Sequence, residues 1–227
     1  AADLPDGGVV QGGSADIIRG ERQMVIEQHS SKAAIDWQSF DIGRDHSVHF
    51  KQPSADAAAL NRVVGADASD IQGSLSANGR VFLVNPNGIV FGPDSRVDVG
   101  ALVASTRDIS AEQFMDGELE FAGETTSAII SQGEIVAREG GLVMMIAAEI
   151  HQNGSIDAPR GDVALVAGER VTLDMGGPVR IEVESSRIAA HIENGGAIRA
   201  DGGRVLLSAD AAHDLAASAI NNTGLIR

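Results

Sequence analysis

The chain of 227 residues contains no cysteine and no tyrosine, and aromatic residues make up only 3% of it. Without cysteine, neither a disulfide framework nor a thiolate-ligated metal site can form. Basic residues are also scarce, because 17 lysines and arginines face 32 aspartates and glutamates, for a formal net charge of −15. Phosphate-binding surfaces need clustered lysine and arginine, so the composition argues against nucleic acid or an anionic membrane as a partner.

Long apolar runs are also missing. The longest candidate, residues 141–148, falls far short of the roughly 18 residues of a membrane span. The first five residues show no basic region followed by an apolar core, so we expect that a signal peptide either never existed or has already been removed. The last residues, 224–227, stop in the middle of a pattern, which predicts the N-terminal fragment of a much longer protein.

The motifs of common catalytic and metal sites are absent too. There is no G-x-S-x-G elbow, no G-x-G-x-x-G and no Walker A pattern. His46 and His49 are three positions apart on a predicted strand and would point to opposite faces. Asp94 and Asp98 lie outside any calcium-binding repeat and are expected to be solvated acids. We therefore expect no enzyme activity, no metal and no cofactor.

Glycine, by contrast, is abundant, with 27 residues, and it punctuates a repeat. Glycine turns precede Ile135, Ile156, Ile198 and Ile226, at spacings of 21, 42 and 28 residues. Taking 42 as two units, the period lies near 21 and carries strands rather than helices. Leucine-rich repeats share this period but need a regular leucine lattice, which is absent here. The pattern therefore predicts an all-β fold, a parallel β-helix or β-solenoid.

The ends and interruptions of this β-helix can be placed along the chain. Residues 1–23 are polar, glycine-rich and irregular, and we expect them to form an N-terminal cap, since an uncapped solenoid end promotes aggregation. The β-helix is predicted over 24–227. Pro53 ends a strand and an alanine-rich stretch follows, so a short helix or an excursion from the sheet is predicted over 53–73.

A single helical turn is predicted where a capping box begins at Ser110. Ser110 and Gln113 have the spacing in which each side chain bonds the backbone of the other, and Gly117 would end the turn.

The centre of the chain is a four-residue turn between two apolar strands. Val81–Val84 and Ile89–Phe91 do not alternate apolar with polar residues, which indicates burial on both faces, so something should cover them from outside. Asn85 precedes a proline and is therefore extended. Pro86 suits the second turn position, and Asn87-Gly88 tolerates positive φ.

Several motifs in this region resemble the secretion domain of two-partner secretion exoproteins, the family of filamentous haemagglutinin and the high-molecular-weight adhesins of Gram-negative bacteria. The chain lacks the Asn-Pro-Asn-Leu motif of the haemagglutinin branch and matches the adhesin branch. The stretches that carry the resemblance are Trp37–Gly43, Phe50–Ser54, Asn61–Val63, Gly73–Gly79, Asn85–Ile89 and Val99–Thr106.

The resemblance implies a right-handed β-helix with extra-helical β elements, and residues 1–227 as one secretion domain. It also implies a signal-cleaved exoprotein that reaches the cell surface or the exterior through the periplasm. Its partner would be an outer-membrane transporter with a β-barrel and periplasmic polypeptide-transport-associated (POTRA) domains, and its first coils would template later ones outside the cell. Any cell-surface or matrix target would be bound by the missing downstream region.

The resemblance also implies a set of secretion-motif residues. Whether the asparagines of the turn contact the transporter or only shape the domain stays open at this point, and exposed polar positions nearby are the better candidates for contact. The residues of the motif are Gln52, Pro53, Asn61, Arg62, Val63, Asn85, Pro86, Asn87, Gly88 and Ile89.

Two other functions deserve comparison. An adhesin module would bind host or biofilm glycans or proteins, and the tripeptide Arg160-Gly161-Asp162 is of the integrin-binding type, although a solenoid needs a glycine turn there anyway. A glycan-cleaving β-helix enzyme would need acids and a base on one face. Arg180, Glu182 and Glu184 share such a face, but with 32 acids in the chain chance placement explains them better.

Overall fold

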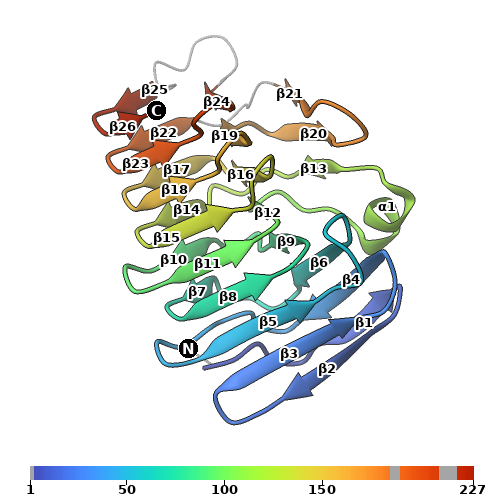
Figure 1. Cartoon of the computed structure of the whole chain (residues 1–227). Coiled ribbons are helices and arrows are strands. Elements are labelled where there is room, and N and C mark those ends of the chain that lie inside the picture. Colours follow the sequence, from blue (N-terminus) through green and yellow to red (C-terminus); the bar gives the residue numbers. More distant parts are fainter. Residues whose placement is uncertain (1–2, 185–189, 210–218) are drawn as a thin grey trace.

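A computed structural model describes residues 3–184, 190–209 and 219–227 of the chain. Strands form almost all of its regular structure, so the all-β prediction is confirmed. Successive turns of the chain, here called coils, stack on one another along the molecule (Figure 1). Each complete coil contributes one strand to each of three sheets, and the strands of neighbouring coils pair in parallel.

The three coil sheets and one smaller sheet contain the following strands. The eight-stranded sheet has the order β1 (Val9–Gly12), β4 (Lys32–Trp37), β6 (Ala58–Val63), β9 (Arg80–Val84), β12 (Ala101–Ser105), β16 (Leu142–Ile146), β19 (Asp162–Ala167) and β24 (Arg204–Ala209). The nine-stranded sheet has the order β2 (Ala15–Arg19), β3 (Gln23–Gln28), β5 (Ser47–Lys51), β8 (Ser74–Ala77), β11 (Arg96–Val99), β15 (Glu134–Ala137), β18 (Ser155–Asp157), β23 (Ala197–Arg199) and β26 (Leu225–Ile226). The six-stranded sheet has the order β7 (Ser69–Ile71), β10 (Ile89–Phe91), β14 (Ala128–Ser131), β17 (Glu149–Gln152), β22 (His191–Asn194) and β25 (Ala219–Asn222). The three-stranded sheet is antiparallel and has the order β13 (Glu120–Ala122), β20 (Arg170–Asp174) and β21 (Arg180–Glu184).

The glycine-marked repeat corresponds to directly stacked coils. Ile135 pairs with Ile156, Ile156 with Ile198, and Ile198 with Ile226. All but the last are completely buried. The interpretation of the 42-residue spacing as two coils is wrong, because β18 pairs directly with β23. The extra residues form an insertion that leaves the coil, and the spacing alone cannot distinguish an insertion from a second coil.

The predicted excursion or short helix over 53–73 is wrong as well. This stretch supplies β6, which pairs with β4 and β9, and β7, which pairs with β10. Its alanines are small enough to fill the crowded core of the sheets, and Ala57 and Ala59 are almost fully buried. Tertiary packing here overrides the helix propensity of alanine.

Residues 9–19 form strands rather than irregular chain. β1 pairs antiparallel with β4, and β2 pairs antiparallel with β3, so both lie at the first end of the coil stack. That they serve as a cap stays a prediction.

Two insertions leave the coils at the same corner, between the eight-stranded and six-stranded sheets. The first holds α1 (Ala111–Asp116) and β13, and the second holds β20 and β21. The helix is confirmed as predicted: Ser110 and Gln113 form a capping box, and Gly117 ends it with φ +83°. The two insertions meet in the three-stranded antiparallel sheet.

The insertions cover the outer face of the eight-stranded sheet and bury a second hydrophobic core there. Phe82 on β9 is 2% exposed and faces outward. Its ring centroid lies 5.1 Å from that of Phe114 on α1 and 6.4 Å from that of Phe121 on β13. The prediction that something covers Val81–Val84 from outside is confirmed. The same prediction for Ile89–Phe91 is met only in part, because Val90 is only half-buried. The outer column of paired residues runs Ala34, Leu60, Phe82, Val103, Met144, Ala164 and Leu206.

Stacked glycines mark the corners where coils turn. A Cβ on Gly154 would lie 2.1 Å from the carbonyl oxygen of Gly133, and one on Gly196 would lie 2.1 Å from that of Gly154. Gly161, the middle residue of Arg160-Gly161-Asp162, stacks in the same way on Gly141, at 2.4 Å. This tripeptide therefore forms a coil turn, as expected from the need of a solenoid for a glycine turn at this position.

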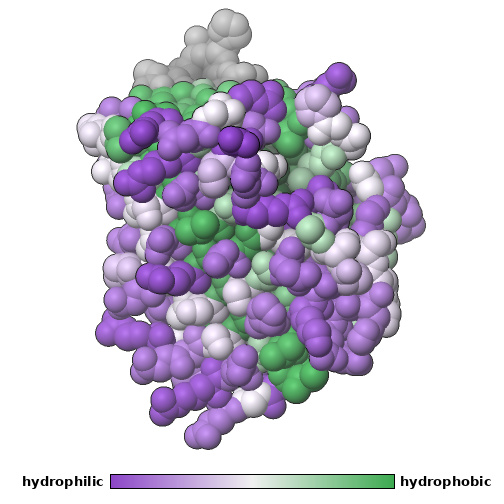
Figure 2. All heavy atoms as spheres, viewed as in Figure 1, coloured by the Kyte–Doolittle hydropathy of each residue, from purple (hydrophilic) through white to green (hydrophobic). Residues whose placement is uncertain are grey.

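Large apolar side chains reach the surface at both ends of the coil stack. At the first end Val9 and Ile18 are 57% and 51% exposed, and a larger group lies near the last strands. Leu206, Ile220, Leu225 and Ile226 are 37–50% exposed. Figure 2 shows hydrophobic residues gathered at this end of the molecule, next to β24, β25 and β26. Within the described ranges, no helix has the length and apolar character needed to cross a membrane.

Candidate functional site

The turn Asn85–Gly88 connects β9 to β10 at the corner between the eight-stranded and six-stranded sheets. The backbone N–H of Gly88 donates to the carbonyl oxygen of Asn85 at 3.1 Å, which closes a four-residue turn. Gly88 has φ +117°, a conformation that side chains other than glycine rarely adopt. The backbone N–H of Asn85 donates to Ser105 of the next coil at 2.9 Å.

The side chain of Asn85 is completely buried and joins the turn to the preceding coil. Its Nδ2 donates to the carbonyl oxygen of Asp67 and to Oγ of Ser69, both at 3.0 Å. Its Oδ1 accepts from the backbone N–H of Asn87 at 3.0 Å. The side chain of Asn85 is therefore inaccessible from solvent in the folded domain, and its hydrogen bonds hold the corner together.

Asn87, unlike Asn85, is exposed to solvent. Its Nδ2 donates to the carbonyl oxygen of Gly65 at 2.9 Å and to Oδ1 of Asn85 at 3.0 Å. Half-buried Pro86 accepts a hydrogen bond from Oγ1 of Thr125 at 2.9 Å. The turn thus lies between the loop 64–68 and the end of the first insertion, and Asn87 faces outward between them.

Gln52 and Pro53 lie at a different corner, between the nine-stranded and eight-stranded sheets. Gln52 is 6% exposed, and its Nε2 donates to Gln28 at 3.1 Å and to the carbonyl oxygen of Arg80 at 3.1 Å. Its Oε1 accepts from the backbone N–H of Gly79 at 2.9 Å. Gln52 therefore links three successive coils, whereas Pro53 is exposed.

Asn61, Arg62 and Val63 lie on β6, beside the strand that leads into the turn. Asn61 and Val63 point into the coil, where Oδ1 of Asn61 accepts from Nε1 of Trp37 at 3.0 Å. Nδ2 of Asn61 donates to the carbonyl oxygen of Phe82 at 3.3 Å. The structure therefore brings this triplet next to the strand before Asn85, while Gln52 and Pro53 remain apart from it.

Arg62 points outward and binds the start of the first insertion. Its Nε and Nη2 donate to the two carboxylate oxygens of Asp108, both at 2.8 Å. This hydrogen bond raises the pKa of Arg62. Asp36 on β4 lies beside the pair, with an oxygen 3.7 Å from Nη1 of Arg62. Burial raises the pKa of Asp36, and the charge of Arg62 opposes that effect only in part.

Asp36→Asn is expected to raise the free energy of unfolding at pH 7 by up to about 1 kcal/mol. Because the pKa of Asp36 is raised in the folded state, folding disfavours its charged form. The free energy of unfolding therefore falls as the pH rises through the folded-state pKa of Asp36. The gain should vanish at about pH 3, where Asp36 is protonated in both states. Urea unfolding of both proteins at the two pH values measures it.

The matched variant Asp108→Asn removes the bidentate partner of Arg62 and should instead cost about 1 kcal/mol, allowing for the partial solvent screening of Asp108. A loss of stability at pH 7 in Asp36→Asn as large as that in Asp108→Asn would show that Asp36 is a stabilising partner of Arg62.

Arg107 joins the bases of the two insertions. It is completely buried, and its Nε donates to the carbonyl oxygen of Gly168 at 2.8 Å. Its Nη1 donates to the carbonyl oxygen of Thr125. Burial lowers the pKa of Arg107, and the charge of Glu169 opposes that shift. The segment that contacts Pro86 is therefore tied to the second insertion as well.

The residues of the alternative functions lie elsewhere. Glu182, Glu184 and Arg180 occupy one face of β21, where Glu184 lies 3.2 Å from Nε of Arg170 in an ion pair. Nδ1 of His49 bonds to Oγ of Ser76 at 2.8 Å.

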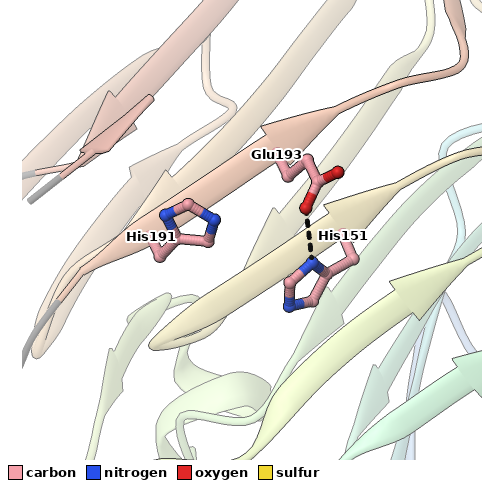
Figure 3. Close-up of side chains that lie close together, drawn as sticks. All are labelled: His151, His191 and Glu193. Atoms are coloured by element: carbon pink, nitrogen blue, oxygen red, sulfur yellow. Dashed lines mark hydrogen bonds and ion pairs between the residues drawn. The ribbon is translucent and has the colours of Figure 1, made fainter. Parts of the chain in front are cut away.

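One cluster escaped the sequence analysis. His151 of β17 lies beside His191 and Glu193 of β22 (Figure 3). The repeat offered a signal for it, since aligning Gly154 with Gly196 places His151 opposite Glu193.

Known proteins resemble this chain over most of its length. A family model described as the TPS secretion domain matches residues 1–227. A heme/hemopexin-binding protein of Haemophilus influenzae strain Rd is 34% identical over 215 residues, which cover 88% of this chain and 23% of that protein. A second heme/hemopexin-binding protein of Haemophilus influenzae is 45% identical over 103 residues, covering 45% of this chain and 11% of that protein. The chain thus spans less than a quarter of the length of these relatives.

Two solved structures share the fold. The HMW1 secretion domain from Haemophilus influenzae superposes with a TM-score of 0.81 at 28% identity, covering 90% of this chain and 57% of that one. The filamentous hemagglutinin secretion domain superposes with a TM-score of 0.60 at 15% identity, covering 98% of this chain and 95% of that one. With the family model matched across its whole length and the coil architecture shared, this chain belongs to the TPS secretion domains of two-partner secretion exoproteins.

Proposed function

We propose that this secretion domain is presented in the periplasm, after signal-peptide removal, to an outer-membrane transporter whose POTRA domains recognise it. Recognition commits a longer exoprotein to export to the cell surface or the exterior. The coils are right-handed, as the family resemblance implies, and β1 and β2 cap their first end. The proposal rests on one observation at the corner between the eight-stranded and six-stranded sheets. There Asn85 is buried and holds the turn, whereas Asn87 is exposed and available to a partner.

The exposed corner is the surface that we assign to the transporter. It consists of Asn87 and the loop 64–68, in which Val64 is 44% exposed. The hydrogen bond from Asn87 to Gly65 holds the two parts together. Strands lie on both sides, and the bonds of Asn85 fix the shape of the corner, so its exposed groups are held rigidly, which lowers the entropy cost of binding.

Folding outside the cell supplies the second half of the proposal. At the last coil, β24, β25 and β26 present strand edges and apolar side chains, Leu206, Ile220 and Leu225 among them. An edge of this kind pairs readily with another strand. In a solenoid each coil contacts only its neighbours, so these strands can template the coil that follows.

Replacing Asn85 and Asn87 separately tests the assignment of the corner. Asn87→Ala is expected to leave the free energy of unfolding within about 1 kcal/mol of the parent, because its side chain is exposed and Oδ1 of Asn85 keeps its bond from the backbone N–H of residue 87. Its export should nevertheless fall clearly. Asn85→Ala should cost about 2–4 kcal/mol, since it leaves buried groups unpaired, and its export should fall through misfolding. Secretion of a fused passenger and urea unfolding measure the two quantities.

Deletion of residues 53–92 is the control for export itself and should leave the passenger in the periplasm. Normal export of that deletion would contradict the proposed role of the domain. Normal export of Asn87→Ala, Val64→Asp and their double variant would contradict only the assignment of the corner. Asp98→Asn, at an exposed position on β11 of the nine-stranded sheet and outside this corner, is the neutral comparison.

A further inference from the structure

Two histidines and two glutamates meet on the outer face of the six-stranded sheet. In the parallel register of β17 and β22, Glu149 pairs with His191 and His151 pairs with Glu193. Side chains two positions apart on a strand share a face, so all four point outward. Ligand atoms of His151, His191 and Glu193 lie within 4.8 Å of one another, and Figure 3 shows the three side chains together above the two strands.

We propose that His151, His191 and Glu193 bind a divalent transition-metal ion, with zinc as the best match. Two imidazole nitrogens and one carboxylate oxygen are the ligands that zinc takes in tetrahedral sites with one open position. Magnesium and calcium prefer oxygen ligands alone, so the two histidines favour zinc, copper or nickel over them. All three side chains are half-buried, which leaves the ion a path from solvent.

Glu149 gives the site an orienting group. Nδ1 of His151 lies 3.3 Å from Oε2 of Glu193, and Nε2 of the same ring lies 3.5 Å from Oε2 of Glu149. When Nδ1 of His151 binds the metal beside Glu193, its Nε2 therefore has the carboxylate of Glu149 next to it. A metal-binding histidine commonly donates its second N–H to such a group, which fixes the ring and strengthens the ligand.

The surrounding charge also suits a cation. The strands of the six-stranded sheet carry no lysine or arginine, so no positive side chain of these strands competes with a metal for the glutamates. The outward neighbours of His151 and Glu193 in adjacent strands are Ile130 of β14 and Asn221 of β25. Among the described strands of this sheet, the glutamates therefore have only the two histidines as basic neighbours.

The position of the site couples metal binding to folding. Its ligands come from two coils that are separated in sequence by the second insertion, so they meet only when those coils have stacked. An ion bound there stabilises the folded state by mass action and holds the two coils together at the insertion.

Calorimetric titration of the 227-residue chain with zinc chloride tests the proposal. We expect one strong site, and with zinc in about hundredfold excess over its dissociation constant the thermal midpoint should rise by roughly 5–10 °C, reversibly with EDTA. The double variant His151→Gln/His191→Gln should lose at least tenfold in affinity and should lose the midpoint shift, while retaining the parent midpoint without zinc. Glu193→Gln should lose about tenfold.

His29→Gln is the matched control, because His29 also lies with two acids, Asp16 and Glu27, but at the first end of the coil stack. It should leave the strong site unchanged. Failure of the parent chain to bind zinc at about 100 µM would overturn the proposal. Equal affinity in the parent and the double variant, or a loss of the strong site in His29→Gln alone, would overturn it too.

Discussion

Replacing Gly154 with alanine is expected to lower the free energy of unfolding by about 4 kcal/mol or more. The added Cβ would lie 2.1 Å from the carbonyl oxygen of Gly133 and 2.6 Å from the carbonyl carbon of Gln132. Both atoms belong to the backbone of the preceding coil, so no flexible side chain can move aside. The coils at this corner must separate, which also weakens the bond from the N–H of Ser155 to Gly133. Urea unfolding followed by circular dichroism measures the loss.

Gly177→Ala is the matched control for this prediction. Gly177 is exposed in the second insertion, and nothing lies within 4 Å of the position of an added Cβ. The substitution should change stability by less than about 0.5 kcal/mol. Similar losses in the two variants would mean that the close approach of stacked glycines is not what limits coil spacing.

Phe82→Ala is expected to cost about 3–5 kcal/mol. The ring is buried between the eight-stranded sheet and the insertions, where Phe114 and Phe121 pack on it. Truncation leaves a cavity that neither α1 nor β13 can close without giving up its own contacts. We further expect hydrogen exchange to quicken in residues 108–122 more than in the coils. Thermal unfolding and exchange mass spectrometry provide the two measurements.

Leu206→Ala supplies the comparison, at the last position of the same outer column. Leu206 is 41% exposed and lies outside the buried outer core. Its loss should cost less than about 1 kcal/mol. A small effect of Phe82→Ala, comparable with that of Leu206→Ala, would show that the insertions merely rest on the sheet without stabilising it.

Local chemistry explains which features the sequence could predict. The Asn85–Gly88 turn, the capping box at Ser110 and the burial of Val81–Val84 on both faces all depend on neighbours in sequence or on strand periodicity. The stacking of Ile135, Ile156 and Ile198 depends on a repeat that survives wherever no insertion interrupts it. These predictions therefore needed no knowledge of distant contacts.

Features set by distant contacts were harder to predict. The alanine-rich stretch 55–60 predicted a helix or an excursion. Its second half instead begins β6 at Ala58, because Ala59 fits beside Val81 in the coil interior. The sequence analysis interpreted the insertion between β19 and β22 as a coil, because its strands alternate apolar and polar residues as the coil strands do. His151 and His191 are forty residues apart, and only the parallel register makes them neighbours.

The asparagines of the turn show the same limit within one motif. From sequence, Asn85 and Asn87 are equivalent polar turn residues. The structure separates them, because the side chain of Asn85 points back to Asp67 and Ser69 while Asn87 stays at the surface. Which residue of a tight turn faces inward depends on the coil beneath it, so the motif alone could not assign them.

The corner that carries both insertions has a consequence for how such a domain can diversify. Between the eight-stranded and six-stranded sheets, the connection is two residues long after β16, 22 residues long after β12 and 23 residues long after β19. The strands on either side keep their register in all three cases. New sequence can therefore be inserted at this corner without changing the spacing of the coils. The corner is thus a suitable place to insert foreign epitopes or tags.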